Sequence, residues 1–243
     1  MSNAQKPSIV FAHGLWADGS CYSKVMKLLQ ADGYEVVSTQ NQLNTVEDDA
    51  AAARTAIGQV SRPVVLVGHS YGGTVITAAG TDERVAALVY ICALAPDEGE
   101  TSQYEQDRHP KTPVFSHIEV IDGRIWQKRD GTPNFCGDLS KEEQELVWAT
   151  QTVPLAELFN EPVHGAAWKS KPTYYVLGLQ DQTVHPDLQH FVAKRMNAKI
   201  TELQSSHVPM LSQPQRVYEV IRDAAEAVAA SKVQVEQRIP TPA

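Results

Sequence analysis

The chain has 243 residues, of which 42% are hydrophobic and 21% are charged, a balance typical of one globular domain with a large buried core. Its net charge of −8 argues against nucleic acid and against anionic membrane surfaces as partners. No apolar run approaches the roughly 20 residues that a membrane helix needs. The polar start MSNAQKPSIV does not resemble a secretory signal, so we expect a cytoplasmic protein.

Up to about residue 95, predicted strands alternate with predicted helices. Strands are expected at 8–12, 34–39, 63–67 and 84–94, and helices at 22–29 and 45–60. Thr45, with Asp48 three residues later, is a suitable helix N-cap. The run RVAALVYICAL is almost entirely apolar, as expected for a strand that is buried on both faces.

The same alternation resumes near residue 172. Strands are expected at 172–177 and 199–203, and helices at 186–196 and 214–230. This pattern predicts a mostly parallel open sheet with helices on both faces, formed by residues 1–95 and 172–231. Residues 232–243 are polar and contain proline, and we expect them to form a disordered tail.

Residues 96–171 interrupt the alternation. The segment IEVIDGRIW predicts a hairpin, because Asp122-Gly123 is a favoured two-residue turn. Ser140-Lys141-Glu142-Glu143 has the form of a capping box that opens a helix, and shorter helical pieces are expected at 155–159 and 164–168. Seven large aromatic residues suit a lid whose apolar underside faces a pocket: Tyr104, Phe115, Trp126, Phe135, Trp148, Phe159 and Trp168.

Ser70 lies between two glycines in VVLVGHSYGGTVITAAG, where a predicted strand gives way to a predicted helix. This context indicates a nucleophile elbow, a strained strand-to-helix turn that exposes a serine hydroxyl. Gly68 and Gly72 stand where strand and helix approach too closely for larger side chains. An ordinary glycine-rich turn is the alternative reading.

A nucleophilic serine needs a base, and the base needs an orienting acid. His207 follows the last predicted strand, at the sheet edge where active sites of open α/β sheets gather. Asp181 follows the preceding strand and is the predicted acid, with Asp187 as its competitor. We expect His69, inside the elbow, to point away. No spacing of histidines or of Cys21, Cys92 and Cys136 resembles a metal site, and the cysteines fit reduced thiols: none is expected to bind metal.

Acyl transfer also needs hydrogen-bond donors aimed at the developing oxyanion. The backbone N–H of Tyr71, directly after the serine, is one candidate. The N–H of Leu15 is the second, because His13-Gly14 ends the first strand and glycine permits a close backbone approach. Trp16 is a candidate for the pocket wall.

Together, HGLW, GHSYGG, the Asp181 turn and the His207 loop resemble the α/β-hydrolase superfamily over residues 8–230. Within it, the chain is similar to small bacterial esterase-like members that are related to plant methyl esterases and hydroxynitrile lyases. The resemblance implies an α/β-hydrolase fold with an inserted lid and no cofactor. It implies Ser70, Asp181 and His207 as the triad and Leu15 and Tyr71 as the oxyanion donors. We add Trp126 and Trp148 to Trp16 as pocket candidates.

The leading hypothesis is a serine hydrolase that cleaves a small carboxylic ester through an acyl-enzyme on Ser70. A lyase acting on cyanohydrins with the same triad is an alternative, and it would need a positive group in the pocket. Seven lid cations are candidates for that group: Arg108, Lys111, Arg124, Lys128, Arg129, Lys141 and Lys169. A weakly catalytic small-molecule receptor is the third hypothesis. An Asp nucleophile, as in epoxide hydrolases and haloalkane dehalogenases, is disfavoured by Ser70. Both a monomer and a homodimer are compatible with the sequence.

Overall fold

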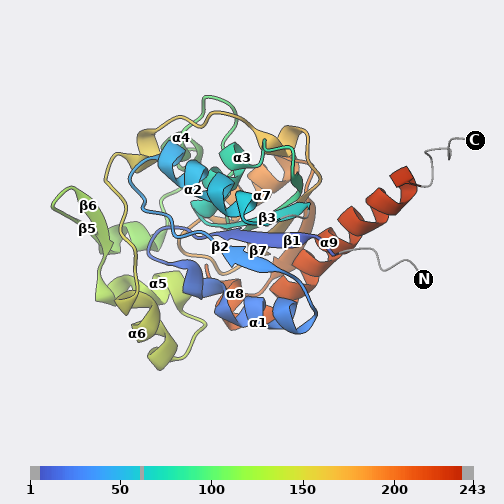
Figure 1. The fold of residues 1–243 in the computed structure, drawn as a ribbon. Helices are drawn as coiled ribbons and strands as arrows, with labels where there is room; N and C mark the ends of the chain where they lie inside the picture. The colour runs from blue at the N-terminus through green and yellow to red at the C-terminus, as the bar shows by residue number, and fades with distance from the viewer. Residues whose placement is uncertain (1–5, 61–62, 237–243) are drawn as a thin grey trace, which may run out of the picture.

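A six-stranded sheet runs through the middle of the molecule in the computed structural model, which describes residues 6–60 and 63–236 (Figure 1). Its strand order is β2-β1-β3-β4-β7-β8, and every neighbouring pair is parallel. The predicted parallel sheet is therefore confirmed. The strands are β1 (Ser8–Ala12), β2 (Val36–Ser38), β3 (Val64–His69), β4 (Val85–Ile91), β7 (Thr173–Gly178) and β8 (Lys199–Leu203).

Helices cover both faces of this sheet. Figure 1 shows α1 (Ser23–Ala31) and α9 (Pro214–Glu236) on one face, and α2 (Val46–Gly58), α3 (Gly72–Ala79) and α7 (Pro186–Arg195) on the other. Every residue of β1 and β3 is buried, because these apolar strands lie at the centre between the two helical layers. Short elements η1 (Gly19–Tyr22) and α8 (Pro209–Ser212) complete this part.

Helix starts follow the predicted capping residues. The Thr45 hydroxyl accepts a hydrogen bond from the backbone N–H of Asp48 and starts α2. Helix α9 extends beyond its predicted end and into the predicted disordered tail, reaching Glu236. The helix continues because the nearest helix-breaking residue is Pro240. The rest of the predicted tail, 237–243, lies outside the described residues.

Strand β4 ends at Ile91, three residues before the predicted end at Leu94. Cys92 has a φ of 45°, and this left-handed conformation breaks the strand although the sequence stays apolar. The predicted strand at 34–39 likewise shortens to β2, Val36–Ser38. The three cysteines are buried and free. Within the described residues, no helix has the length and apolar character to cross a membrane.

The segment between β4 and β7 contains the predicted hairpin, β5 (Ile118–Ile121) and β6 (Arg124–Gln127), with Asp122 and Gly123 both at positive φ. Its helices are α4 (Ser102–Gln106), α5 (Thr132–Cys136) and α6 (Lys141–Ala149), and α6 opens with the predicted capping box. The helical pieces expected at 155–159 and 164–168 are only the short turns η4 (Leu158–Asn160) and η5 (Ala167–Lys169). Two further turns are η2 (Pro113–His117) and η3 (Arg129–Gly131).

Candidate active site

Ser70 occupies a sharp turn between β3 and α3, with a φ of 55°. A residue with a side chain would not fit in place of either of the two glycines that flank this turn. A Cβ on Gly68 would lie 2.4 Å from the carbonyl oxygen of Gly72, and a Cβ on Gly72 would lie 2.2 Å from that of Ala12. The strained serine and its two obligatory glycines have the geometry of the predicted nucleophile elbow.

His207 and Asp181 meet below this turn, in the loops that follow β8 and β7. The distance between His207 Nδ1 and Asp181 Oδ2 is 2.7 Å, and both side chains are fully buried. Asp187, the competing acid, has a side chain that is 78% exposed at the first turn of α7. The structure therefore pairs His207 with Asp181 and leaves Asp187 at the surface.

Four hydrogen bonds fix the Asp181 carboxylate. Besides the His207 ring, the donors are the backbone N–H groups of Thr183 and Val184, at 2.7 and 3.0 Å, and Nε2 of Gln189, at 2.7 Å. Gln189 is fully buried, and its Oε1 also accepts from the N–H of Gly178. Sequence reasoning did not single out Gln189, because a buried glutamine on a helix carries no motif.

The prediction that His69 points away from the site is wrong. Its Nε2 lies 2.8 Å from the carbonyl oxygen of His207, and the two imidazole rings are 4.6 Å apart. Burial lowers the pKa of His69 well below its ordinary value, so the ring stays neutral and donates its Nε2 proton to that carbonyl. Phe135 packs on the other side, 5.0 Å from the His207 ring. His207 is thus held by neighbours on several sides.

Nε2 of His207 is buried and has no hydrogen-bond partner among the described residues. A buried polar nitrogen without a partner costs free energy. Because Nδ1 is engaged by Asp181, Nε2 is the nitrogen left to exchange a proton. Catalytic hydrogen bonds are often long in the absence of substrate and shorten only in the complex.

The backbone N–H groups of Leu15 and Tyr71 donate no hydrogen bond to any residue in 6–60 or 63–236. Gly14 brings the first of these beside the serine: a Cβ at Gly14 would lie 2.6 Å from Cβ of Ser70. The two amides predicted as oxyanion donors therefore have no acceptor in the described residues, and Leu15 directly follows Gly14, whose backbone lies close to Ser70.

His13 holds the Leu15 loop in place. Its Nε2 accepts a hydrogen bond from the backbone N–H of Asn41 at 2.8 Å, and its carbonyl oxygen accepts one from the Asn41 side chain. Its Nδ1 lies 2.9 Å from the carbonyl oxygen of Gly14. Burial lowers the pKa of His13, which favours the neutral ring that these bonds require.

Tyr71 also carries a buried side chain, and its hydroxyl donates to Asp49 at 3.1 Å. Asp49 accepts a second bond from the N–H of Leu43, a residue at φ 58°. Burial raises the pKa of Asp49 to about 6 in spite of these donors. The contact anchors the residue after the serine to the start of α2.

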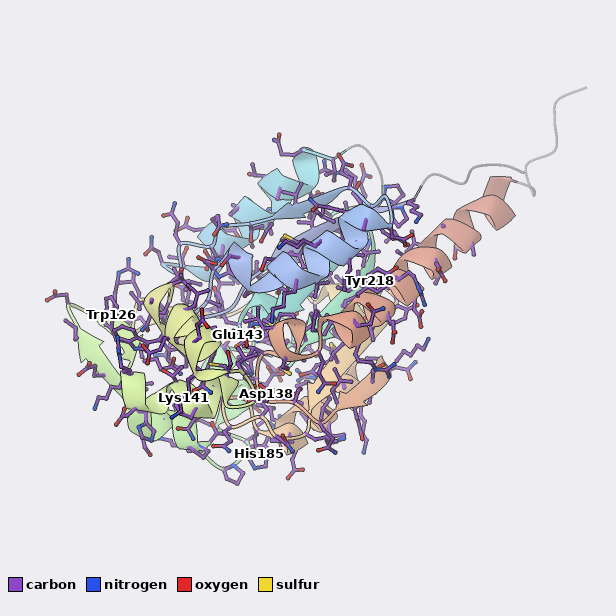
Figure 2. The ribbon with its side chains drawn as sticks, turned by 90° about the horizontal axis from the view of Figure 1, so that it is seen from below. Trp126, Asp138, Lys141, Glu143, His185 and Tyr218 are labelled. Carbon is purple, nitrogen blue, oxygen red and sulfur yellow. The ribbon has the colours of Figure 1, made fainter. Side chains whose placement is uncertain are left out.

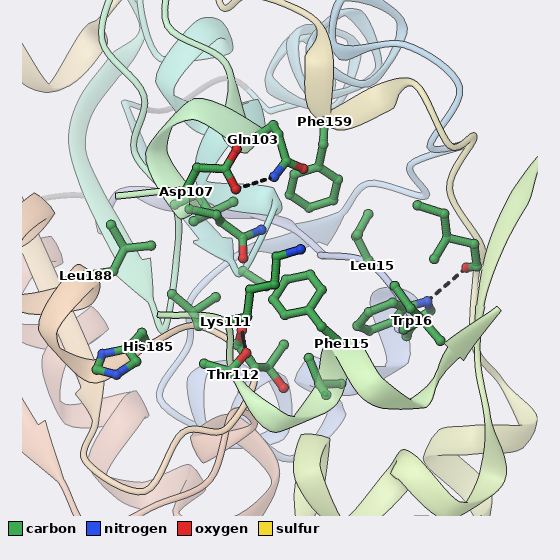
Figure 3. A pocket seen from close by; sticks show the side chains of 18 of the residues that line it. Leu15, Trp16, Gln103, Asp107, Lys111, Thr112, Phe115, Phe159, His185 and Leu188 are labelled. Atoms are coloured by element: carbon green, nitrogen blue, oxygen red, sulfur yellow. Dashed lines mark hydrogen bonds between the residues drawn. The ribbon is translucent and has the colours of Figure 1, made fainter. Parts of the chain in front are cut away.

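A cavity of about 190 Å³ opens over Ser70. Figure 3 shows its apolar wall, to which Leu15, Trp16, Phe115, Phe159 and Leu188 contribute. Its rim is polar and comes mainly from α4 and the segment that follows it, with His185 from the core. The rim residues are Gln103, Gln106, Asp107, Lys111 and His185.

Trp16 lines this cavity as predicted, but Trp126 and Trp148 do not. Trp126 is 37% exposed on the hairpin, at the outer edge of the molecule in Figure 2. Side chains alternate along a strand, and it is the neighbouring Ile125 that faces the cavity. Trp148 instead packs on the Arg129 guanidinium and donates its indole N–H to the Gln127 carbonyl.

One buried group has the composition of a metal site, since ligand atoms of Cys92, Asp181 and His207 lie within 4.8 Å of one another. The Asp181 oxygens, however, already accept four hydrogen bonds. Burial, aided by the nearby Asp181 carboxylate, raises the pKa of the Cys92 thiol well above its ordinary value. A protonated thiol is a poor metal ligand. Asp181 and His207 therefore fit an acid–base pair better than a metal centre.

The fold and this site point to one class of protein, and the model of the alpha/beta hydrolase family matches residues 9–220. The chain belongs to this family. Over 250 residues it is 30% identical to the alpha/beta hydrolase nvfD of Aspergillus novofumigatus, with 90% of this chain and 97% of that protein covered. The membership predicted from HGLW, GHSYGG and the two loops is confirmed.

Other relatives carry more specific names. The chain is similar to the pyrethroid hydrolase of Sphingobium wenxiniae, at 27% identity over 91% of this chain and 88% of that one. It is also similar to methylesterase 8 of Arabidopsis thaliana, at 22% identity and 86% of each chain. The solved structure of a pyrethroid hydrolase from Sphingobium faniae shares the fold, with a TM-score of 0.78, 24% identity and coverage of 91% and 98%.

Proposed function

We propose that this protein hydrolyses a small, largely apolar carboxylic ester, with Ser70 as the nucleophile and His207 and Asp181 as base and orienting acid. The observation that carries the proposal is the buried 2.7 Å bond between His207 and Asp181, with the His207 ring 4.6 Å from that of His69, which directly precedes the serine of the strained elbow. The names of the relatives, a pyrethroid hydrolase and a methylesterase among them, support ester hydrolysis.

In the proposed reaction, His207 Nε2 takes the Ser70 proton while the serine oxygen attacks the ester carbonyl. The negative charge that develops on the carbonyl oxygen is stabilised by the free N–H groups of Leu15 and Tyr71. Asp181 fixes the imidazole tautomer and stabilises its cation. His207 then returns the proton to the leaving alcohol, and water hydrolyses the acyl-enzyme by the same steps in reverse order.

Residues 96–171 would act as the lid of this site. Their contribution to the cavity wall comes from the turn η2, strand β6 and turn η4, through Phe115, Ile125 and Phe159. Apolar side chains that exclude water from the reacting carbonyl strengthen the electrostatic stabilisation of its oxyanion. The cavity wall is mostly apolar, which favours an apolar acyl or alcohol group.

The test is a burst assay with p-nitrophenyl butyrate, combined with mass detection of the protein. We expect a product burst and one added butyryl mass on the wild type, and neither on Ser70→Ala. The control for the variant is a circular dichroism spectrum and a melting temperature close to those of the wild type. A wild-type protein that is folded but never acylated would contradict the proposal.

A further inference from the structure

The cavity over Ser70 is apolar for most of its wall but contains one ammonium group. Lys111 lies at its rim, and Figure 3 shows its exposed side chain beside Phe115. Lys111 forms no hydrogen bond or ion pair with any residue in 6–60 or 63–236. An exposed ammonium at the rim of an apolar cavity, with no ion-pair partner in the described residues, is a candidate for binding an anion.

Most other cations of the lid are engaged elsewhere. Arg124 donates to Val153 and Asn44, and Lys169 pairs with Asp97. Arg108 and Arg129 lie over aromatic rings. Of the seven lid cations considered from the sequence, Lys111 is the one among the lining residues of this cavity as the structure describes it.

The rim offers one possible counter-ion, Asp107, and it is turned to another partner. Its Oδ1 accepts a hydrogen bond from Gln103 Nε2 at 2.8 Å, which Figure 3 shows across the cavity from the lysine. No ion pair joins it to Lys111 in the described part of the chain. The ammonium is therefore available to a ligand, while Asp107 keeps its negative charge at the same rim and accepts one hydrogen bond from Gln103.

We propose that Lys111 binds an anionic group at the end of the substrate remote from the scissile ester. The preferred substrate class would then be the half-ester of a dicarboxylic acid, or an equivalent ester with a second, negatively charged group. This inference rests on the proposed ester hydrolysis at Ser70. The apolar wall would hold the chain or ring between the two polar ends.

An anionic substrate needs such a contact here because the whole chain carries a net charge of −8, which disfavours the approach of anions. Lys111 is exposed at the rim, so its contact with a carboxylate would be partly screened by water and salt. We expect a preference of about three- to tenfold in kcat/KM, the range for one partly screened ion pair.

The experiment compares mono-p-nitrophenyl succinate, glutarate and adipate with neutral p-nitrophenyl esters of the same chain length. For each chain length, the ratio of kcat/KM for the anionic ester to that for the neutral ester is measured at low and high salt. The variant is Lys111→Met, which keeps the length of the side chain and removes its charge. The matched control is Lys141→Met, an exposed lid lysine on α6 outside the cavity (Figure 2).

We expect the ratio for at least one chain length to fall about three- to tenfold in Lys111→Met and to stay unchanged in Lys141→Met. High salt should reduce the wild-type ratio and leave that of Lys111→Met unaffected. Equal ratios in wild type and Lys111→Met at every chain length would overturn the inference. The neutral esters report separately on Ser70, so their hydrolysis would leave the proposed function standing.

Discussion

At the scale of single residues, the Asp181 carboxylate depends on Gln189 as well as on His207. We predict that Gln189→Leu lowers kcat about tenfold with little change in KM. The substitution removes a 2.7 Å donor to Asp181 and leaves the N–H of Gly178 without its acceptor. A carboxylate that can rotate orients the imidazole less well. The measurement is the steady-state rate with p-nitrophenyl butyrate.

The control is Gln180→Leu, a change of the same type at an exposed position next to Asp181, in the loop after β7. It should leave kcat unaltered. A general loss of packing in Gln189→Leu would lower the melting temperature and the fraction of active protein, without lowering kcat per acylated site. Active-site titration in the burst assay distinguishes the two cases, and an unchanged kcat per site would contradict the role given to Gln189.

The residues proposed for the chemistry were the ones that the sequence singled out most clearly. Ser70 lies between glycines whose role is steric, and Asp181 and His207 follow apolar strands whose ends meet at one sheet edge. The cavity wall was less predictable. Trp126 and Trp148 are large enough to line a pocket. Strand alternation instead places Trp126 at the surface, and Trp148 packs against Arg129. The type of residue alone predicts neither position. The prediction for His69 was wrong because a residue that directly precedes Ser70 in the chain can also pack against the ring of His207.

At the scale of elements, the short helix α5 and the residues after it connect the lid to both loops of the site. The Asp138 carboxylate accepts from the N–H of Ser206 at 3.0 Å and from its hydroxyl. The carbonyl of Phe135 accepts from the N–H of His207 at 3.2 Å. On the Asp181 side, the carbonyl of Asn134 accepts from the Thr183 hydroxyl. This segment therefore holds the loops of both His207 and Asp181 in place.

We predict that Asp138→Ala lowers kcat/KM about tenfold while lowering stability by about 1.5 to 3 kcal/mol, the usual net value of a hydrogen bond to a charged group. The Ser206 loop would then be free to shift the imidazole. The control is Glu142→Ala, an exposed lid carboxylate without a partner in the described residues. Rates with p-nitrophenyl butyrate and urea unfolding provide the two readouts, and an unchanged kcat/KM would contradict the positioning role given to Asp138.

For the whole molecule, the order of strands and helices followed from periodicity, because a parallel sheet with helices on both faces leaves few arrangements. The sequence did not predict how residues 96–171 are attached to that sheet. The attachment uses side chains distant in the chain, such as Glu105 in α4 and Arg195 in α7, 2.7 Å apart. Neither residue lies in a motif, and a pairing across 90 positions has no local signal.

The titration of Glu105 predicts how the free energy of unfolding depends on pH. Glu105 is 1% exposed and accepts from Arg195 and from the N–H of Ala95. Burial outweighs the attraction of Arg195 and raises the pKa of Glu105 from 4.5 to about 7. Between these two values the folded chain binds more protons than the unfolded chain. The free energy of unfolding therefore falls as pH rises through this window.

Glu105→Gln removes this titration, so the variant should gain stability relative to wild type between pH 4.5 and pH 8. Each pKa unit corresponds to about 1.4 kcal/mol, so we expect a relative gain of about 1 to 3 kcal/mol. Urea unfolding of both proteins at several pH values measures it, with the exposed Glu83→Gln as the matched control. The plots of unfolding free energy against pH could instead be parallel for the variant and the wild type. Glu105 would then be ionised in the folded protein over the whole range, because its attraction to Arg195 would outweigh the cost of burying its charge. A relative gain would mean that the contribution of Glu105 to stability is complete below about pH 4.5 and is lost as the pH rises to about 7.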